Sequence, residues 1–309
     1  MNKIILVINA GSSSIKFSIF NNLSELSLLY HGTIEINHAS SVLSILNVQH
    51  EPILKKNLTS IVFSELFSSI FEWLDNLPIK YILEAVGHRV VHGGRNFVAP
   101  VIVNGDIINQ IAELIPLAPL HQEHNLNAIK IIANLYPKLI QVACFDTGFH
   151  HCQDNLAKLF AIPRKLTQAG IIRYGFHGIS YEYIASIIVD SIGEIGNKRV
   201  IVAHLGNGAS MCAMNMCQSV ATSMGFTALD GLVMGTRSGR IDPGVILYLM
   251  QEKQYTVNQL LHLLYQESGL LGVSGISNDV RKLLNSNNSC ATEAVDLFCY
   301  RAALEVGSL

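Results

Sequence analysis

Short apolar runs alternate with polar turns at the start of the chain. Residues 3–8 are of strand length and apolar after Lys3, residues 15–20 are of strand length with apolar residues interrupted by Lys16 and Ser18, and residues 9–14 between them read Asn-Ala-Gly-Ser-Ser-Ser. Buried strands have this length, and glycine and serine are common in the turns that join them. The pattern predicts two strands connected by a tight turn.

The same pattern returns in the second half of the chain. Residues 199–203 and 209–214 predict two strands, and residues 204–208 (His-Leu-Gly-Asn-Gly) predict the turn between them. An ungapped alignment places Val7 on Val202, Gly11 on Gly206 and Ser12 on Asn207. Repetition of a structural unit favours a duplicated domain, and two unrelated hairpins are the alternative.

Apolar residues at helical spacing lie between the two hairpins. Residues 60–74 and 125–136 place apolar side chains on one face of a helix, whereas residues 82–86 and 140–145 are short apolar runs that predict strands. The first half therefore continues as helix, strand, helix and strand.

The second half lacks counterparts of those last two strands. After its hairpin, helices are predicted near residues 256–265 and 292–306, and the sequence ends at Leu309. An incomplete sheet leaves edge groups and an apolar face uncovered. We therefore expect a fragment or a shortened gene product with an incomplete second domain, poor solubility or thermal stability, and little activity.

Length and charge narrow the classes of function. A chain of 309 residues is long enough for two domains, at roughly 100–200 residues each, and we expect residues 1–148 to form one and residues 149–309 the other. The formal net charge is −2 and no basic tract is present, which argues against a nucleic-acid partner. No apolar run approaches the ~18 residues of a membrane span, so we expect a cytoplasmic protein.

The two turns are candidate phosphate sites. Glycine-rich turns expose backbone N–H groups that can surround a phosphate, and the first turn adds polar groups from Asn9, Ser12, Ser14 and Lys16. The GxxxxGK[ST] pattern of P-loop enzymes is absent. An ordinary tight turn is the alternative for either segment.

Four of the nine arginines flank glycines. Arg89 and Arg95 lie beside a Gly-Gly pair, and Arg237 and Arg240 lie in the segment Met-Gly-Thr-Arg-Ser-Gly-Arg. Guanidinium groups pair bidentately with carboxylates and phosphates, so these segments suit anion recognition. Arginines on solvated loops are the alternative.

Two further residues have side chains suited to phosphate chemistry. Asp146 follows the strand predicted at 140–145, where a carboxylate commonly faces a ligand and could hold Mg²⁺; a turn or capping aspartate is the alternative. His177 lies between glycines, which allows close approach to a ligand, and Ser180 is expected to cap the helix at 181–190. A buried structural histidine is the alternative for His177.

Together these motifs resemble the acetate kinase family in order and spacing. The matching stretches are residues 7–17, 87–95, 117–121, 145–150, 173–180, 204–208, 222–239 and 272–281. The resemblance implies an α/β fold with two related ribonuclease-H-like domains of the actin-like ATPase and sugar kinase superfamily, which close over a central cleft, the second being incomplete here. It also implies a homodimer that uses Mg²⁺ and ATP to phosphorylate acetate or propionate, by direct in-line transfer without a nucleophilic side chain.

The resemblance also implies a role for each matching residue. Arg89 and Arg237 would hold the carboxylate and the migrating phosphoryl group, His177 would stabilise the transition state, and Asp146 with Asn9 would position Mg²⁺. The groups near the nucleotide phosphates would be Asn9, Ser12, Ser14, Lys16, His204, Gly206, Asn207 and Gly208. The adenosine pocket would be bordered by Asp279, Val280 and Arg281. The acyl end of the substrate would meet Val91, Leu120, Phe176 and Ala228, and His121 would line the site.

The sequence departs from the common family pattern at several positions. Gln122 and Glu123 replace Asn-Pro, Tyr181 replaces histidine, Ala221 replaces aspartate and Ala228 replaces proline. The last change enlarges the expected acyl pocket and favours propionate as well as acetate. The family's glycine-rich adenosine motif and a further Mg²⁺-binding glutamate would lie beyond Leu309.

Three hypotheses follow. The first is a kinase of acetate or propionate, the second is a shortened and catalytically inactive chain of the same family, and the third is a phosphohydrolase in which water replaces the carboxylate. Two arginines suited to a carboxylate acceptor, Arg89 and Arg237, favour the first hypothesis over the third.

Overall fold

The computed structural model describes residues 2–23, 26–37, 39–77 and 79–309. The chain separates into two compact units, Met1–Gly148 and Phe149–Leu309. These bounds coincide with those expected of the two domains, and independent folding of each unit stays a prediction. No helix within the described residues is long and apolar enough to cross a membrane.

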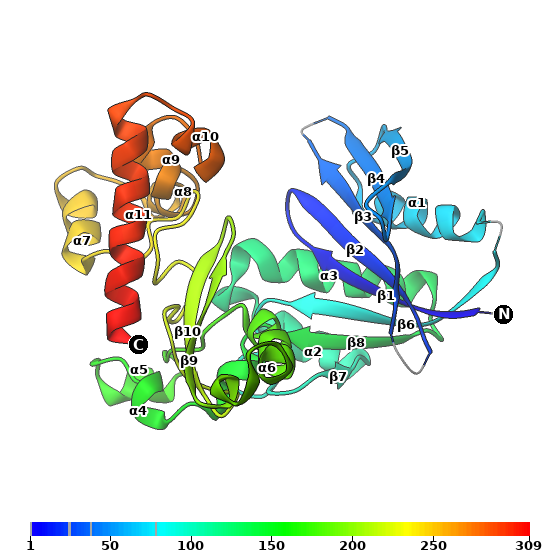
Figure 1. Ribbon diagram of the computed structural model, residues 1–309, viewed down its shortest axis with the longest axis horizontal. Helices are drawn as coiled ribbons and strands as arrows, with labels where there is room; N and C mark the ends of the chain where they lie inside the picture. Colours follow the sequence, from blue (N-terminus) through cyan, green and yellow to red (C-terminus); the bar gives the residue numbers. More distant parts are fainter. Residues whose placement is uncertain (1, 24–25, 38, 78) are drawn as a thin grey trace. The chain divides into compact units, whose positions relative to one another are not determined.

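The first unit is built on one mixed sheet of eight strands in the order β5-β4-β3-β2-β1-β6-β8-β7 (Figure 1). Strands β1 to β5 form an antiparallel meander, β6 and β8 continue the sheet in parallel with β1, and β7 is antiparallel to β8. The strands are β1 Asn2–Ala10, β2 Ser14–Asn21, β3 Leu28–Ile36, β4 Ser41–Asn47, β5 Pro52–Leu58, β6 Tyr81–Val90, β7 Val101–Ile102 and β8 Ile140–Phe145.

Helices pack against this sheet through an alternating pattern of buried residues. In β1, Ile4, Leu6 and Ile8 are buried while their neighbours are more exposed, because successive side chains of a strand point to opposite faces. The buried face packs in one cluster with apolar residues of α1 and α3. The helices of this unit are α1 Phe63–Asp75, α2 Gly105–Glu113, the 3₁₀ turn η1 Ile115–Leu117 and α3 Pro119–Leu135.

The second unit has an antiparallel sheet of three strands in the order β11-β10-β9, together with helices. The strands are β9 Arg199–Leu205, β10 Ala209–Asn215 and β11 Gln218–Thr222. Helix α6 packs on this sheet through the buried Tyr181, Cys212 and Met214. The α-helices are α4 Asn155–Lys158, α5 Arg164–Gln168, α6 Gly178–Ile192, α7 Pro243–Gln251, α8 Val257–Gln266, α9 Gly269–Ser274, α10 Val280–Leu284 and α11 Ser289–Ser308; the 3₁₀ turns are η2 Gly148–Cys152 and η3 Gly193–Asn197.

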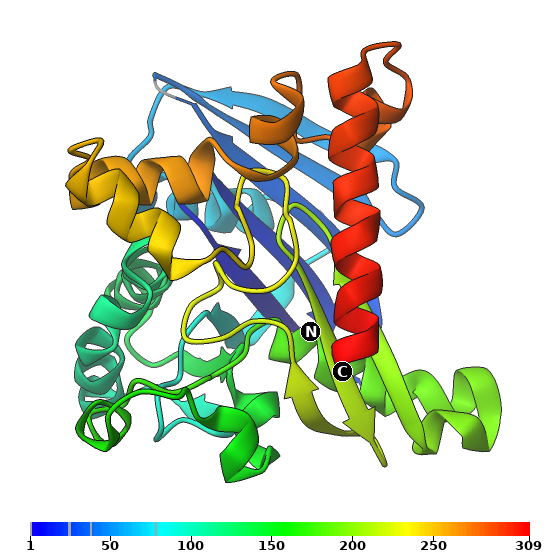
Figure 2. The same cartoon turned by 90° about the vertical axis from the view of Figure 1, so that its left-hand side faces the viewer.

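Helix α11 is the longest helix among the described residues, and α9 and α10 pack against its first half (Figure 2). Ala291 and Ala294 are buried at this contact, with Leu270 of α9 and Leu283 of α10. Small residues on α11 let the shorter helices approach closely. This cluster supports the loop that carries Arg237, because backbone N–H groups of α9 bond to that loop.

The two predicted hairpins are present, and their turns differ by one residue. In the first hairpin Ala10 pairs with Ile15, whereas in the second Leu205 pairs with Ala209. The first strands and the beginnings of the turns match without a gap, but the second strands match only after a one-residue gap. The N–H of the first turn glycine bonds within each turn, to Ser14 in one and to Gly208 in the other.

Candidate active site

Three candidate residues of the first unit lie together at the carboxyl ends of neighbouring parallel strands. Asn9 lies near the end of β1, Arg89 lies near the end of β6, and Asp146 follows β8 directly. Because β1, β6 and β8 are parallel, these ends meet at one edge of the sheet, where open α/β sheets commonly bind ligands.

Arg89 connects the other two residues. Its Nε lies 3.0 Å from both carboxylate oxygens of Asp146, and its Nη2 lies 2.5 Å from Oδ2. Its Nη1 donates to Asn9 Oδ1 at 3.1 Å. Asp146 is almost fully buried, so its charge is separated from solvent and paired with Arg89. Burial alone would lower the pKa of Arg89, but the charge and hydrogen bonds of Asp146 raise it, and the guanidinium stays charged.

Donors of Arg89 remain available for a substrate. A guanidinium has five N–H groups, and within the described part of the chain the contacts to Asp146 and Asn9 engage three of them. Nη1 and Nη2 each retain one N–H, and the side chain is one-third exposed. Arg89 lies in strand β6 and not in the turn where the sequence placed it.

The other first-unit candidates lie at the β1–β2 hairpin or near α3. Ser12 and Lys16 are exposed at the hairpin, and Ser14 is the first residue of β2. The N–H of Ile36 in β3 donates a hydrogen bond to the carbonyl of Ser13. The acyl candidates are half-exposed Leu120 and His121 on α3 and nearly buried Val91 just after β6.

Two buried amides on α3 fix the segment after β6. Gln122 accepts from the N–H of His92 and donates to its carbonyl. Asn125 accepts from the N–H of Val91 at 2.9 Å and donates to the carbonyl of Ala10 at 2.7 Å. These side chains position both Val91 and the end of β1. Sequence reasoning missed Asn125 and recorded Gln122 only as a departure from the family pattern.

In the second unit, His177 lies beside the glycine turn between β9 and β10. A Cβ placed on Gly208 would lie 3.4 Å from His177 Nε2 and 3.6 Å from Arg237 Nη1. The ring of His177 also stacks on that of His204, with centroids 4.1 Å apart. A histidine and an arginine therefore flank a turn whose glycine leaves space between them.

His177 is the N-cap of α6 and has a left-handed backbone, with φ of 58°. The expectation that Ser180 caps a helix beginning at 181 is wrong. The left-handed residue starts the helix at Gly178, and the Ser180 hydroxyl lies within the first turn, 2.9 Å from His204 Nδ1.

The loop that carries Arg237 is held against the turn by backbone contacts. Gly235 donates its N–H to the carbonyl of Asn207 at 3.0 Å, and Arg237 Nη1 donates to the carbonyl of Ala228 at 3.0 Å. A Cβ on Gly235 would lie 2.1 Å from Asn207 Oδ1, so a larger residue here would displace the Asn207 side chain. Ala228 therefore contacts Arg237 through its backbone.

The remaining candidates of the second unit are the adenosine-pocket residues on α10 and the acyl-pocket residue Phe176. Asp279 caps α10 and pairs with Arg281 at 2.9 Å, and Val280 is the first residue of that helix. Asn278, the residue before Asp279, lies 3.4 Å from Asn207 Oδ1, which places the α10 terminus close to the phosphate-turn candidate. Phe176 is only 1% exposed and belongs to the core of its unit.

Comparisons with known proteins show which family the chain belongs to. The Acetokinase family model matches residues 4–309. The chain belongs to the acetokinase family. It is 49% identical over 317 residues to an acetate kinase of Rhodopseudomonas palustris (strain TIE-1), covering 100% of this chain and 79% of that protein. It is 43% identical over 313 residues to an acetate kinase of Rickettsia akari (strain Hartford), covering 100% of this chain and 80% of that protein.

Solved structures of the acetokinase family share the fold. A propionate kinase from Francisella tularensis subsp. tularensis SCHU S4 is similar with a TM-score of 0.92 and 37% identity, over 99% of this chain and 79% of that one. The Porphyromonas gingivalis acetate kinase is similar with a TM-score of 0.88 and 34% identity, over 99% of this chain and 79% of that one. The predicted α/β fold of this family is confirmed.

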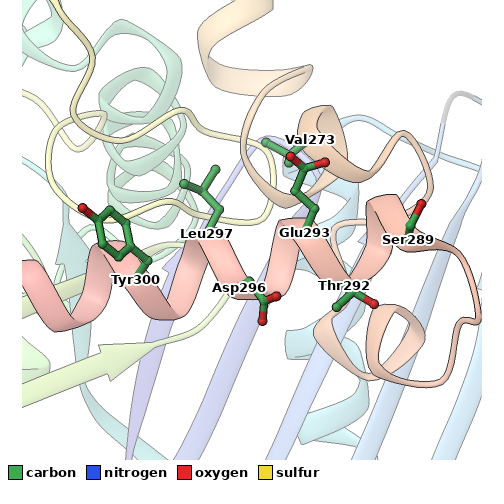
Figure 3. A pocket seen from close by; sticks show the side chains of 7 residues that line it. All are labelled: Val273, Ser289, Thr292, Glu293, Asp296, Leu297 and Tyr300. Atoms are coloured by element: carbon green, nitrogen blue, oxygen red, sulfur yellow. The ribbon is translucent and has the colours of Figure 1, made fainter.

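A cavity of about 610 Å³ in the second unit is lined by none of these candidate residues. Figure 3 shows that most of its lining residues lie on α11, among them Glu293, Asp296 and Tyr300, and that α9 contributes Val273. Two carboxylates and no cationic side chain line it, so it does not suit a phosphate group.

Two side chains of the first-unit cluster, which accept from Arg89 in this structure, could contribute oxygens to a Mg²⁺ site. Asp146 and Asn9 offer a carboxylate and an amide oxygen, and Mg²⁺ typically takes one or two carboxylates with waters and substrate phosphates. Across the described residues no group of three His, Cys, Asp or Glu side chains could hold a metal.

Proposed function

We propose that this chain transfers the γ-phosphoryl group of ATP to acetate or propionate, giving an acyl phosphate and ADP. The observation that carries the proposal is the pair of cationic or hydrogen-bonding side chains, His177 and Arg237, that both lie next to Gly208 in the turn between β9 and β10. Phosphoryl transfer spreads negative charge over the equatorial oxygens, so it needs donors placed around that group. The named relatives, which are acetate and propionate kinases, support the choice of acceptor.

In the proposed step, a carboxylate oxygen of the substrate attacks the γ-phosphorus in line with the leaving group. The new O–P bond forms while the bond from the γ-phosphorus to the β,γ-bridging oxygen breaks, and that oxygen leaves with ADP. No side chain is required as nucleophile. Mg²⁺, when bound by Asp146 and Asn9, would neutralise charge on the β- and γ-phosphate oxygens.

Each residue then has a defined task. Arg89 directs its remaining N–H groups at the carboxylate, and Asp146 keeps the guanidinium in a fixed orientation. Arg237 is held by Ala228 and supplies charge to the γ-phosphoryl oxygens. Backbone N–H groups of the Gly206–Gly208 turn bind the phosphates, as glycine turns commonly do.

Acyl phosphate formation tests the function. Hydroxylamine trapping with ATP, Mg²⁺ and acetate should give acetyl hydroxamate. Gly208→Ala should lower kcat/KM by about 10² or more, because its methyl group fills the space beside His177 and Arg237. Gly105, whose added Cβ would meet nothing within 4 Å, is the matched control as Gly105→Ala. Orthophosphate release without acyl phosphate would favour a phosphohydrolase and contradict the proposal.

The acyl preference depends on Ala228. We propose that its small side chain accommodates propionate, since one methylene in a fitted pocket is worth about 1–3 kcal/mol. Ala228→Pro retains the carbonyl that receives Arg237 and should shift the ratio of kcat/KM values toward acetate. A strong acetate preference with Ala228, unchanged by proline, would contradict this. The expected homodimer also stays a prediction, which light scattering in solution tests.

A further inference from the structure

His177 is connected to the core of its unit through two hydroxyl groups. Its Nδ1 lies 2.8 Å from Ser210 Oγ, and Ser210 Oγ lies 2.5 Å from Tyr181 Oη. Ser210 and Tyr181 are both 0% exposed. Tyr181 lies in the first turn of α6, and Ser210 lies in β10 opposite His204. Water is therefore excluded from the links behind the imidazole.

The direction of these hydrogen bonds follows from counting protons. Burial raises the pKa of Tyr181, so its phenol remains protonated. Its oxygen accepts a hydrogen bond from the backbone of His204. Within the described residues, Ser210 Oγ is the one side-chain partner of the phenol, so Tyr181 donates its proton to Ser210. Any other direction leaves a buried O–H without an acceptor, which is unfavourable.

Ser210 then has one proton of its own to donate. Because its oxygen already receives the proton of Tyr181, its O–H satisfies a buried donor by pointing at His177 Nδ1. Nδ1 must then be an acceptor, and the proton of a neutral imidazole is on Nε2. If Nδ1 carried the proton instead, Ser210 would receive two donors and its own O–H would lack this acceptor.

We propose that Tyr181 and Ser210 are positioning residues that hold His177 in the neutral tautomer with its proton on Nε2. This inference rests on the proposed function for its catalytic meaning. Nε2 is the atom next to the Gly208 turn, so an Nε2–H donates directly to a phosphoryl oxygen bound there. The donor is present without protonation of the ring from solvent.

The charged and titratable groups around His177 agree with a neutral ring. His204 of β9 stacks on it at 4.1 Å, and Arg237 approaches the same side of the Gly208 turn. A second positive charge beside these groups would be repelled. Tyr181, from the same helix as His177, supplies a neutral hydroxyl.

Nitrogen-15 spectra of histidine-labelled protein test the tautomer directly. Two-bond proton–nitrogen correlations distinguish Nδ1–H from Nε2–H rings, and His177→Gln identifies the signals of His177. The expected result is an Nε2–H ring at neutral pH in the parent protein. An Nδ1–H or doubly protonated His177 would overturn the proposal. This measurement needs no turnover, so it separates the proposal from the proposed kinase activity, which acetyl phosphate formation tests.

Tyr181→Phe should release this constraint. We expect a mixture of tautomers at His177, a kcat about tenfold lower and a KM for ATP changed less than twofold. Tyr174→Phe is the matched control, since it removes another nearly buried phenol, which donates to the Gly170 carbonyl at 2.9 Å, and it should leave both readouts unchanged. An unaltered tautomer and kcat in Tyr181→Phe would overturn the proposal. Should Tyr181→Phe not fold, the parent spectrum alone decides.

Discussion

At the scale of single residues, the first-unit site is organised by one buried ion pair. Arg89 donates several hydrogen bonds to Asp146, and its Nη1 donates a further one to Asn9. A buried pair of this kind contributes modestly to stability, because desolvation offsets much of the attraction. Its main effect is to orient the Arg89 guanidinium. Breaking the pair is nevertheless costly, because it leaves one charge buried without a partner.

Arg89→Ala should therefore affect both activity and stability. Loss of the carboxylate contact should reduce kcat/KM for acetate by about 10²–10³, several kcal/mol of transition-state stabilisation. The unpaired Asp146 should lower the free energy of unfolding by about 3–5 kcal/mol. Steady-state kinetics and urea denaturation measure the two effects, with exposed Arg164→Ala as control. Undiminished acyl phosphate formation would remove Arg89 from the site.

Two buried histidines of the first unit make its stability depend on pH. Burial lowers the pKa of His88 to about 4 and of His92 to about 4. Between that value and the unfolded pKa near 6.5, the unfolded chain binds more protons, so stability falls as pH decreases through this window. Each histidine should cost about 2 kcal/mol between pH 7 and pH 5.

Urea titrations at several pH values measure this loss. His88→Asn should flatten the pH dependence by about half, even though it also removes the 2.7 Å contact to Gln141 and lowers stability at pH 7. His151→Asn, at an exposed histidine, should leave the slope unchanged. Equal slopes in parent and His88→Asn would contradict the assignment.

At the scale of elements, helix α3 acts as the support for the segment that follows β6. Gln122 and Asn125 project from one face of the helix, and both satisfy buried backbone groups of that segment. The helix therefore determines where Val91 and the carboxyl end of β1 lie.

Gln122→Ala and Asn125→Ala should each destabilise the protein by about 1–3 kcal/mol, because backbone donors and acceptors lose their partners in a dry environment. Both should also raise the KM for the carboxylate, since Val91 is no longer held. Exposed Asn127→Ala on the same helix is the control. Thermal unfolding measures the loss of stability, and steady-state kinetics measures the KM for the carboxylate. An unchanged KM despite reduced stability would show that α3 has no role in substrate binding.

The sequence predicted elements whose pattern was continuous and missed those whose pattern was mixed. β1, β9 and β10 read as mainly apolar runs, β2 reads as apolar residues alternating with Lys16 and Ser18, and all four are confirmed. Strands β3 to β5 were missed because polar residues such as His31, Thr33 and Glu35 interrupt them. Gly32 in β3 also argues against a strand, but a Cβ there would lie 2.3 Å from the ring of Phe17, so packing requires glycine.

The candidate site, too, could be predicted only in part from the sequence. Turn residues such as Gly208 and charged residues such as Arg89 and Asp146 could be nominated from local motifs. Their supporting partners could not, because Ser210 is 33 residues from His177, and Gln122 is 30 residues from His92. Such contacts depend on strand register and helix orientation, which local periodicity does not encode.

At the scale of the whole molecule, each unit contains apolar clusters of its own. The largest clusters of the first unit combine β1 to β4 with α1 and α3, and β6 and β8 with α2 and α3. The second unit has separate clusters around α11 and around α6. A cluster formed within one unit can hold that unit together, which is the usual property of a domain.

Residues 1–148 should therefore fold when expressed alone. Every strand of the eight-stranded sheet and its covering helices α1 and α3 lie within this range, so the core that stabilises it is retained. Cooperative thermal unfolding and a dispersed proton–nitrogen spectrum are the expected results. The Arg89–Asp146 pair belongs wholly to this unit, so Arg89→Ala should lower the unfolding temperature of the isolated unit as it does in the whole chain. Exposed Lys138→Ala is the control on the same unit. A non-cooperative transition in the parent unit would show that the first unit depends on the second for its stability, and would contradict its assignment as a domain.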